Sequence, residues 1–479
     1  MVFSSSFFLC AFLPAVILLY FLCRAPGYRN ALLFLASLFF YAWGEPRNLL
    51  LLLTSVLINY LFALSISRRQ SAGKGGTRLL LVISAAINCL ILFVYKYLNF
   101  ALENINALLS LLGSRSALPK TALSLPIGIS FFTFQAMSYV VDVYRRTAPA
   151  QTSIINFGLY LSFFPQLIAG PIVRYSTVAE EISRRSVSTD DFAEGARRFI
   201  LGLGKKRLIA DTVALLADYA FETISYSPLG FVGAWFGAVC YTLQIYFDFS
   251  GYSDMALGLG RLFGFHFPEN FSYPYAASSV TDFWRRWHIS LSSWFRDYVY
   301  IPLGGSRVPK KRLFFNLLVV WLLTGIWHGA NWTFIVWGLS YFVLLSLEKF
   351  TGLGALPKKS RLAALFCRLF TIIAVILCWV IFRSDNMTLA VKYIGCMLHP
   401  RAEYAAFGLK YFSPRYICVV LFSAFLSLPL ARNVWRKIRP RLPRFLSAAA
   451  EDAFYLALLL LSLATAVSST YNPFIYFNF

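Results

Sequence analysis

Two of the four histidines stand directly after a tryptophan, His288 in RRWHIS and His328 in GIWHGANW. His328 follows the apolar run Leu313–Trp327. An ionisable side chain in such a run is costly to place at membrane depth and is by default a functional candidate. An imidazole accepts a proton from a hydroxyl near neutral pH and returns it later. We therefore predict that His328 and His288 carry acid–base chemistry; the alternative is a neutral core histidine bonded to a carbonyl.

The other two histidines have polar surroundings. We expect His399 in CMLHPR to be solvated and His266 in FGFHFPENF to anchor a loop. The two tryptophan-linked histidines are forty positions apart, without an H-x-x-x-H or paired cysteines, so we predict no metal site. The eight cysteines form no C-x-x-C pair and lie mostly in apolar runs, as small hydrophobic residues do.

Three further residues are predicted to support the site. Trp327 adjoins His328, and Asn331 follows three positions later. On a continuous helix Asn331 would share the face of His328 and its amide would fix the ring tautomer, although an asparagine here also suits a helix cap. Asp254 lies seven positions before Arg261, so we expect a structural ion pair on one helical face.

The whole composition is that of a membrane protein. Of 479 residues, 58% are hydrophobic and 14% are charged, and the mean hydropathy is +0.64. A soluble protein has about 25% charged residues. One helical span of a bilayer needs about 20 mostly apolar residues, and several runs approach or reach that length. The recurring runs are Phe7–Leu22, Ala31–Trp43, Leu49–Ile66, Leu79–Leu98, Leu201–Phe221, Leu313–Trp327, Phe366–Phe382, Tyr416–Leu430 and Phe454–Val467.

The net charge of +23 is distributed over short basic loops between these runs. This is the positive-inside pattern of membrane proteins, so we predict no nucleic-acid binding. Placing the basic loops in the cytoplasm gives about eleven spans with both termini outside. No polar stretch is long enough for a soluble domain, so we predict one integral membrane domain over residues 1–479. The segment Asn156–Trp337 is too interrupted for simple spans, and we expect the cavity there.

Four motifs follow one another along the chain: PQLIAGPIVRY, YFDFSGYSDMALGLGRLFGFHFPENF, FWRRWHISLSSWFRDYVYIPLGG and TGIWHGANWTFIVWG. In this order they resemble the membrane-bound O-acyltransferases, specifically the alginate O-acetyltransferase branch. MVFSS, LPIGISFFTFQAMSYVVDVYR and the terminal NPFIYFNF match the same branch. The D-alanyl transfer proteins of teichoic acid modification share the histidine motifs but match the flanking segments less well.

The resemblance implies an all-α polytopic fold, in which a ring of about eleven transmembrane helices and shorter or re-entrant helices surrounds a funnel. It implies that His328 is the catalytic base and His288 the second signature histidine. Segment Phe283–Gly305 would line the cytoplasmic funnel. Its arginines would then bind the phosphates of an acyl donor, because guanidinium forks pair well with phosphate. The alternative role is positive-inside anchoring; the three arginines are Arg285, Arg286 and Arg296.

The implied reaction moves an acyl group, most simply acetyl, from a cytoplasmic thioester such as acetyl-CoA to a polysaccharide hydroxyl outside. An extracytoplasmic transferase of the SGNH type is the expected partner, no cofactor stays bound, and the protein lies in a bacterial inner membrane. One alternative is D-alanyl or other acyl transfer from a carrier protein to teichoic acid or a lipid-linked glycan. Another is a polysaccharide export channel, which predicts two repeated halves. The acceptor polymer stays open.

Overall fold

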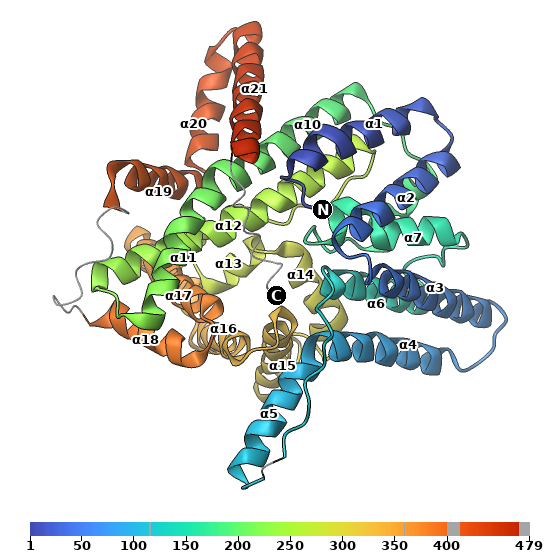
Figure 1. Cartoon of the computed structure of the whole chain (residues 1–479), viewed down its shortest axis with the longest axis horizontal. Coiled ribbons are helices and arrows are strands. Elements are labelled where there is room, and N and C mark those ends of the chain that lie inside the picture. Colours follow the sequence, from blue (N-terminus) through green and yellow to red (C-terminus); the bar gives the residue numbers. More distant parts are fainter. Residues whose placement is uncertain (115, 359, 400–411, 469–479) are drawn as a thin grey trace. The chain divides into compact units, whose positions relative to one another are not determined.

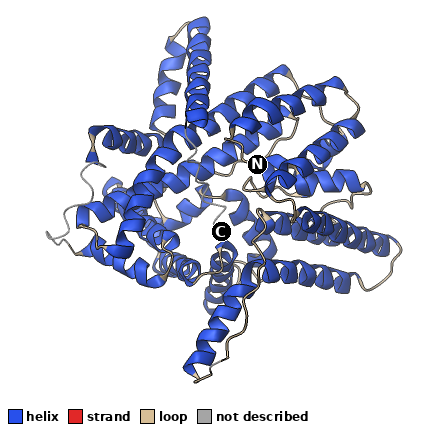
Figure 2. Ribbon diagram, in the orientation of Figure 1, coloured by secondary structure: helices blue, strands red, loops and turns tan. Residues whose placement is uncertain are grey.

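The computed structural model describes residues 1–114, 116–358, 360–399 and 412–468. Within these ranges the chain forms helices joined by loops, without a β-strand (Figure 2). The predicted all-α class is therefore confirmed. The terminal motif NPFIYFNF lies outside the described residues.

Two compact units make up the chain, one of residues 1–196 and 256–268 and the other of residues 197–255 and 269–479. Two long helices, α10 (Thr189–Gly204) and α12 (Phe231–Leu262), contribute residues to both. The single integral domain stays a prediction. Within the second unit, a Cβ on Gly202 of α10 would lie 2.5 Å from the carbonyl oxygen of Gly251 on α12. Glycine therefore allows these two helices to approach closely.

The first unit is a set of helices with polar contacts buried between them. Helices α3, α4 and α6 pack against one another (Figure 1). Between α3 and α4, the amide of Asn88 donates to Asn59 at 2.8 Å, the kind of bond that joins helices in an apolar medium. The helices are α1 (Leu13–Leu22), α2 (Pro26–Gly44), α3 (Leu49–Ser71), α4 (Thr77–Leu92), α5 (Leu98–Leu111), α6 (Ile129–Arg145), α7 (Ile154–Ser162), α8 (Phe164–Leu167) and α9 (Tyr175–Ser183), with π-helical turns η1 (Phe8–Phe12) and η2 (Phe93–Tyr97).

The second unit contains both tryptophan-linked histidines. Short helices of seven residues alternate here with longer ones, as the interrupted pattern of the middle segment predicted. Its elements are η3 (Lys205–Ala210), α11 (Asp211–Tyr226), η4 (Pro274–Ala276), α13 (Val280–Arg286), α14 (Ile289–Phe295), η5 (Arg296–Tyr300), α15 (Lys310–His328), α16 (Trp332–Thr351), η6 (Leu353–Lys358), α17 (Arg361–Arg383), α18 (Met387–Leu398), α19 (Pro414–Leu426), α20 (Leu430–Ile438), η9 (Arg439–Arg441) and α21 (Arg444–Ser468).

Helices α15 and α16 form a close pair in the second unit, and two glycines permit it. A Cβ on Gly325 would lie 2.5 Å from the carbonyl oxygen of Phe334, and one on Gly338 would collide with the carbonyl oxygen of Trp321. Any larger residue would push the two backbones apart. This close pairing brings the C-terminal end of α15 against the first turns of α16.

Five described helices are long and apolar enough to cross a bilayer, or six if one bent pair counts as a span. The bent pair is α19 with Leu430–Arg441, at 70°. The predicted span Tyr416–Leu430 is thus interrupted, at Ser427–Pro429, because proline cannot continue the α19 hydrogen-bond ladder. The protein is a multi-pass membrane protein, while the count of about eleven spans stays a prediction.

Candidate active site

His328 is the last residue of α15 and is 4% exposed. The chain leaves the helix in an extended conformation at Gly329. A Cβ on Gly329 would collide with the ring of Phe334, so only glycine fits between His328 and the next helix. The short link Gly329–Asn331 then returns the chain into α16.

Aromatic rings from three helices surround the His328 imidazole. Its centroid lies 4.8 Å from that of Trp327 on α15, 4.7 Å from Trp337 on α16 and 5.2 Å from Phe382 on α17. All three are edge-to-face contacts, the favoured geometry for aromatic pairs. Packing therefore holds the imidazole and limits the access of water to it.

His288 is fully buried and has a left-handed backbone, with φ +43° and ψ +56°, just before α14. Its Nδ1 lies 3.2 Å from Oδ1 of Asn270. It lies outside the candidate spans, and burial lowers its pKa to about 3, so the ring is neutral at physiological pH. The Trp327 ring lies 6.1 Å from His288 and 4.8 Å from His328, and so contacts both predicted catalytic residues.

A cleft of about 290 Å³ opens beside α13, α14 and α15. Half of its lining belongs to segment Phe283–Gly305, which contributes seven of the fourteen residues. The lining residues are Thr281, Trp284, Arg285, Leu291, Ser292, Phe295, Arg296, Tyr300, Leu317, Val320, Trp321, Thr324, Leu345 and Lys349.

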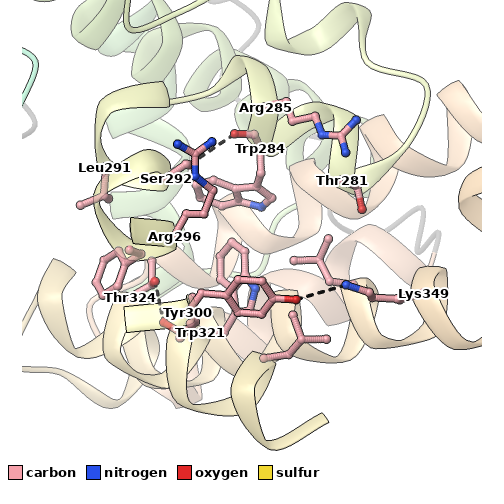
Figure 3. Close-up of a pocket in the computed structure, with 14 residues that line it drawn as sticks. Thr281, Trp284, Arg285, Leu291, Ser292, Arg296, Tyr300, Trp321, Thr324 and Lys349 are labelled. Carbon is pink, nitrogen blue, oxygen red and sulfur yellow. Dashed lines mark hydrogen bonds between the residues drawn. The ribbon is translucent and has the colours of Figure 1, made fainter. Parts of the chain in front are cut away.

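The cleft has an exposed cationic rim and a buried aromatic floor (Figure 3). We define the rim as Arg285, Arg296 and Lys349, all exposed, and the floor as Trp284, Trp321 and Thr324, all buried. Thr324 precedes His328 by one helical turn on α15, so the floor approaches the histidine. The cations of the rim suit a phosphate ligand, and the buried floor suits the thioester arm of an acyl donor.

Rim residues have partners of their own. The Lys349 ammonium donates to the Tyr300 hydroxyl at 3.3 Å. Arg296 donates twice to the carboxylate of Asp297, at 2.7 and 3.1 Å. Because that carboxylate offsets part of the Arg296 charge, Arg285 and Lys349 are the stronger candidates for a phosphate contact.

A buried carboxylate on α16 fixes the helix that carries Trp284 and Arg285. Glu348 accepts hydrogen bonds from the backbone N–H groups of Val280 and Thr281, at 2.5 and 2.9 Å, and from the Thr281 hydroxyl at 2.5 Å. These groups form the N-terminal turn of α13, where an anion is favoured by unpaired N–H groups and the helix dipole. Glu348 thus aligns one wall of the cleft.

The structure separates Arg286 from the other two predicted donor-binding arginines. Its guanidinium pairs with Asp282, one turn earlier on α13, at 2.9 Å, and it does not line the cleft. Successive residues on a helix point in directions about 100° apart, so Arg285 and Arg286 do not share the cleft-facing side. Arg286 is thus outside the cleft lining, and its predicted role in donor binding stays a prediction.

Asn331 is a helix cap, and the helical face that it was predicted to share with His328 is not formed. Helix α15 ends at His328, so the two residues do not share a helical face. The Asn331 side chain accepts from the N–H of Thr333 at 3.1 Å and donates to the carbonyl of Asp385 at 2.8 Å. The capping alternative is the one observed.

The expected pair between Asp254 and Arg261 is also wrong. Asp254 pairs with Arg198 at 2.6 Å and with Lys205 at 2.5 Å. Arg261 pairs with Asp191 and Glu194, at 3.3 and 2.6 Å. Partners from α10, together with Lys205, the first residue of η3, replace the same-helix partner, because α10 packs along α12 in each unit. The ion pair between Asp254 and Arg198 therefore stabilises the packing of α10 on α12.

The remaining histidines behave as predicted. The exposed His266 anchors a loop through Glu181, with Nδ1 2.8 Å from the carboxylate. His399 is exposed and its Nδ1 contacts the carbonyl of Gly395. Within the described residues, no group of three or more histidine, cysteine or acidic side chains is arranged to hold a metal ion.

Sequence reasoning missed several residues of the cleft. Lys349 lies in the last turn of an apolar helix, as a membrane anchor would, while Trp321 and Thr324 occupy ordinary positions of an apolar run. Spacing offered one usable pattern, since Trp321, Thr324 and His328 repeat at helical intervals. No spacing pattern in the sequence pointed to Glu348, because its hydrogen-bond donors, Val280 and Thr281, lie far from it along the chain.

Comparison with known proteins assigns the family. A sequence model of the membrane-bound O-acyltransferase family matches residues 38–382. The chain belongs to the membrane-bound O-acyltransferases. It is 38% identical to the probable alginate O-acetylase AlgI of Pseudomonas putida over the full length of both chains. It is 36% identical to the peptidoglycan O-acetyltransferase of Helicobacter pylori, over 83% of this chain and 80% of that one. A teichoic acid D-alanyltransferase of Bacillus subtilis is 28% identical over 47% of this chain and 59% of its own.

Membership of this family confirms the resemblance and makes the protein an enzyme, an O-acyltransferase of the membrane. The export-channel alternative is thereby replaced. The matched region contains both His288 and His328 and the whole cleft.

Proposed function

We propose that this O-acyltransferase moves an acetyl group from a cytoplasmic thioester, acetyl-CoA or an acetylated carrier, toward the hydroxyl of an extracytoplasmic polysaccharide. The observation that carries the proposal is the cleft, whose cationic rim leads to a buried floor one helical turn from His328. Acetyl is favoured over D-alanine because the acetylase relative matches the full chain, whereas the D-alanyltransferase matches 47% of it.

In the proposed mechanism the donor phosphates lie at Arg285 and Lys349, and the thioester arm lies along Trp284 and Trp321. His328 removes the proton of the acceptor hydroxyl as its oxygen attacks the thioester carbon. The new C–O bond forms, the C–S bond breaks, and the proton passes from His328 to the departing thiolate. His288 orients the reacting groups. General acid–base assistance of this kind accelerates a reaction by roughly 10²–10⁴-fold.

The acetyl group then leaves on the outer side, either on the polysaccharide or through a transferase partner of the SGNH type. The positive-inside distribution of basic loops supports an inner-membrane location with both termini outside. The acceptor is a glycan, since the relatives are named for alginate and peptidoglycan.

The first test uses purified full-length protein in lipid vesicles with acetyl-CoA, or an acetylated carrier protein, and a panel of polysaccharides. His328→Ala should abolish acetyl transfer at unchanged protein level, while His399→Ala, at an exposed position, should keep it. Full activity of His328→Ala would refute the assignment of the base.

The second test reverses charge at the rim. Arg285→Glu and Lys349→Glu should each raise KM for the donor by about tenfold with kcat within twofold, since a charged hydrogen bond is worth about 1.5–3 kcal/mol, less at an exposed rim. The matched control is Arg286→Gln, next in the chain but paired with Asp282. Equal effects at 285 and 286 would contradict the proposed donor site.

A further inference from the structure

Asn270 lies in the link between α12 and α13, and although its side chain is polar the residue is only 1% exposed. It contacts His288, which precedes α14, and Ile289 and Ser290, the first two residues of α14. Its backbone carbonyl accepts from the N–H of Ile289 at 3.0 Å. Its side-chain Oδ1 accepts from the N–H and the hydroxyl of Ser290, at 3.2 and 2.9 Å, and lies 3.2 Å from Nδ1 of His288.

These contacts determine which atom of the Asn270 amide faces the histidine. The backbone N–H of Ser290 can only donate, so the atom facing it must be the oxygen. An amide flipped by 180° would place its NH₂ group against that N–H. The oxygen that the N–H fixes is the same atom that lies beside Nδ1 of His288.

The orientation of the amide in turn fixes the imidazole. A neutral histidine has one protonated ring nitrogen and one with a lone pair. Facing Oδ1 of Asn270, a lone pair on Nδ1 would be repelled, whereas an N–H is attracted. The Ser290 hydroxyl, 3.4 Å from Nδ1, gives its own proton to Asn270 at 2.9 Å and so also presents an oxygen lone pair to Nδ1.

We propose that Asn270 is a positioning residue for acyl transfer, which holds His288 as its Nδ1–H tautomer and leaves the lone pair on Nε2. The inference rests on the proposed role of His288 in the reaction. In this tautomer Nε2 can accept a hydrogen bond from a substrate group other than the reacting hydroxyl, whose single proton goes to His328, and it cannot donate one to an oxyanion. The tautomer thereby assigns His288 to orienting the substrate instead of stabilising negative charge.

The backbone conformation of His288 gives Asn270 a second role. A left-handed conformation is unfavourable for a residue with a Cβ and persists only where neighbouring contacts enforce it. The bonds from Ile289 and Ser290 to Asn270 lie directly after the left-handed residue. One asparagine thus sets both the backbone and the tautomer of His288.

The tautomer is measured by solid-state NMR on full-length protein in lipid bilayers, with ¹³C- and ¹⁵N-labelled histidine. The chain has four histidines, and His288 is identified by the signals that His288→Gln removes. We expect its proton on Nδ1 near neutral pH. Exposed His266 and His399 serve as internal references. A proton on Nε2 of His288 in the native protein would overturn the inference.

Two variants separate positioning from simple structural support. Asn270→Leu removes the acceptor and should move proton density to Nε2, with kcat lowered by about tenfold or more and donor KM within twofold. Asn270→Asp keeps an acceptor oxygen, so it should keep the Nδ1–H form and recover more activity than the leucine variant. An unchanged tautomer in Asn270→Leu contradicts the proposal; if that variant does not fold, the native and Asn270→Asp spectra decide.

The activity of His288→Gln tells the two proposals apart. If His288→Gln is fully active while the native spectrum shows Nδ1–H, the catalytic role of His288 fails and the tautomer assignment stands. If His288→Gln is inactive and the native proton lies on Nε2, only the role of Asn270 fails.

Discussion

The two predicted catalytic histidines are held in opposite ways. His328 ends a long apolar helix and is enclosed by the rings of Trp327, Trp337 and Phe382. His288 lies in a turn with left-handed backbone and is held by hydrogen bonds around Asn270. The ring contacts fix where the His328 imidazole lies, and the hydrogen bonds around Asn270 in addition select one tautomer of His288. A fixed tautomer suits the orienting role proposed for His288.

The largest effect on the rate of acetyl transfer is expected from adding one carbon atom to the packing beside His328. In Gly329→Ala the new Cβ meets the ring of Phe334, so the end of α15 must shift. A displacement of about 1 Å near the reacting atoms costs roughly 10²-fold in rate. Initial rates of acetyl transfer at saturating donor measure the loss.

The matched control for this variant is Gly395→Ala in α18, where a Cβ would meet nothing within 4 Å. Its rate should stay within twofold of the native protein. Since Gly329 has an extended backbone that any residue adopts, the effect at 329 is one of space alone. Equal rates for both variants would show that the position of His328 does not depend on this packing.

Sequence reasoning located His328 and His288 because a histidine in an apolar chain is conspicuous. It also identified the helical class and the interrupted middle segment. It failed at Asn331 because α15 ends at His328, so the helical spacing on which the shared face depended does not extend to position 331. The partners of Asp254 and Glu348 come from distant segments that spacing along one helix cannot reveal.

The second effect concerns the burial of His288, and it appears in stability. Its pKa is about 3 in the folded protein, against an ordinary value of 6.5. Between these values the unfolded chain binds a proton that the folded chain does not, so stability falls as pH drops from 6.5 toward 3. His288→Gln removes this contribution, and its melting temperature should depend less steeply on pH in that range. Parallel curves of melting temperature against pH would argue that the ring is solvated.

The smallest effect on activity is expected at Asn331. Substituting this residue tests whether a side-chain hydrogen bond from Asn331 helps to hold the His328 ring. Asn331→Ala removes the cap of α16 and the bond to the carbonyl of Asp385. Loss of a cap costs about 1 kcal/mol of unfolding free energy. Because the His328 ring is held by packing, kcat should stay within twofold while thermal stability falls. Asn331→Asp, which retains a capping oxygen, should recover most of that stability. The opposite outcome is a tenfold loss of kcat in Asn331→Ala, with neither kcat nor stability recovered in Asn331→Asp. That result would tie the Asn331 amide to the chemistry of His328.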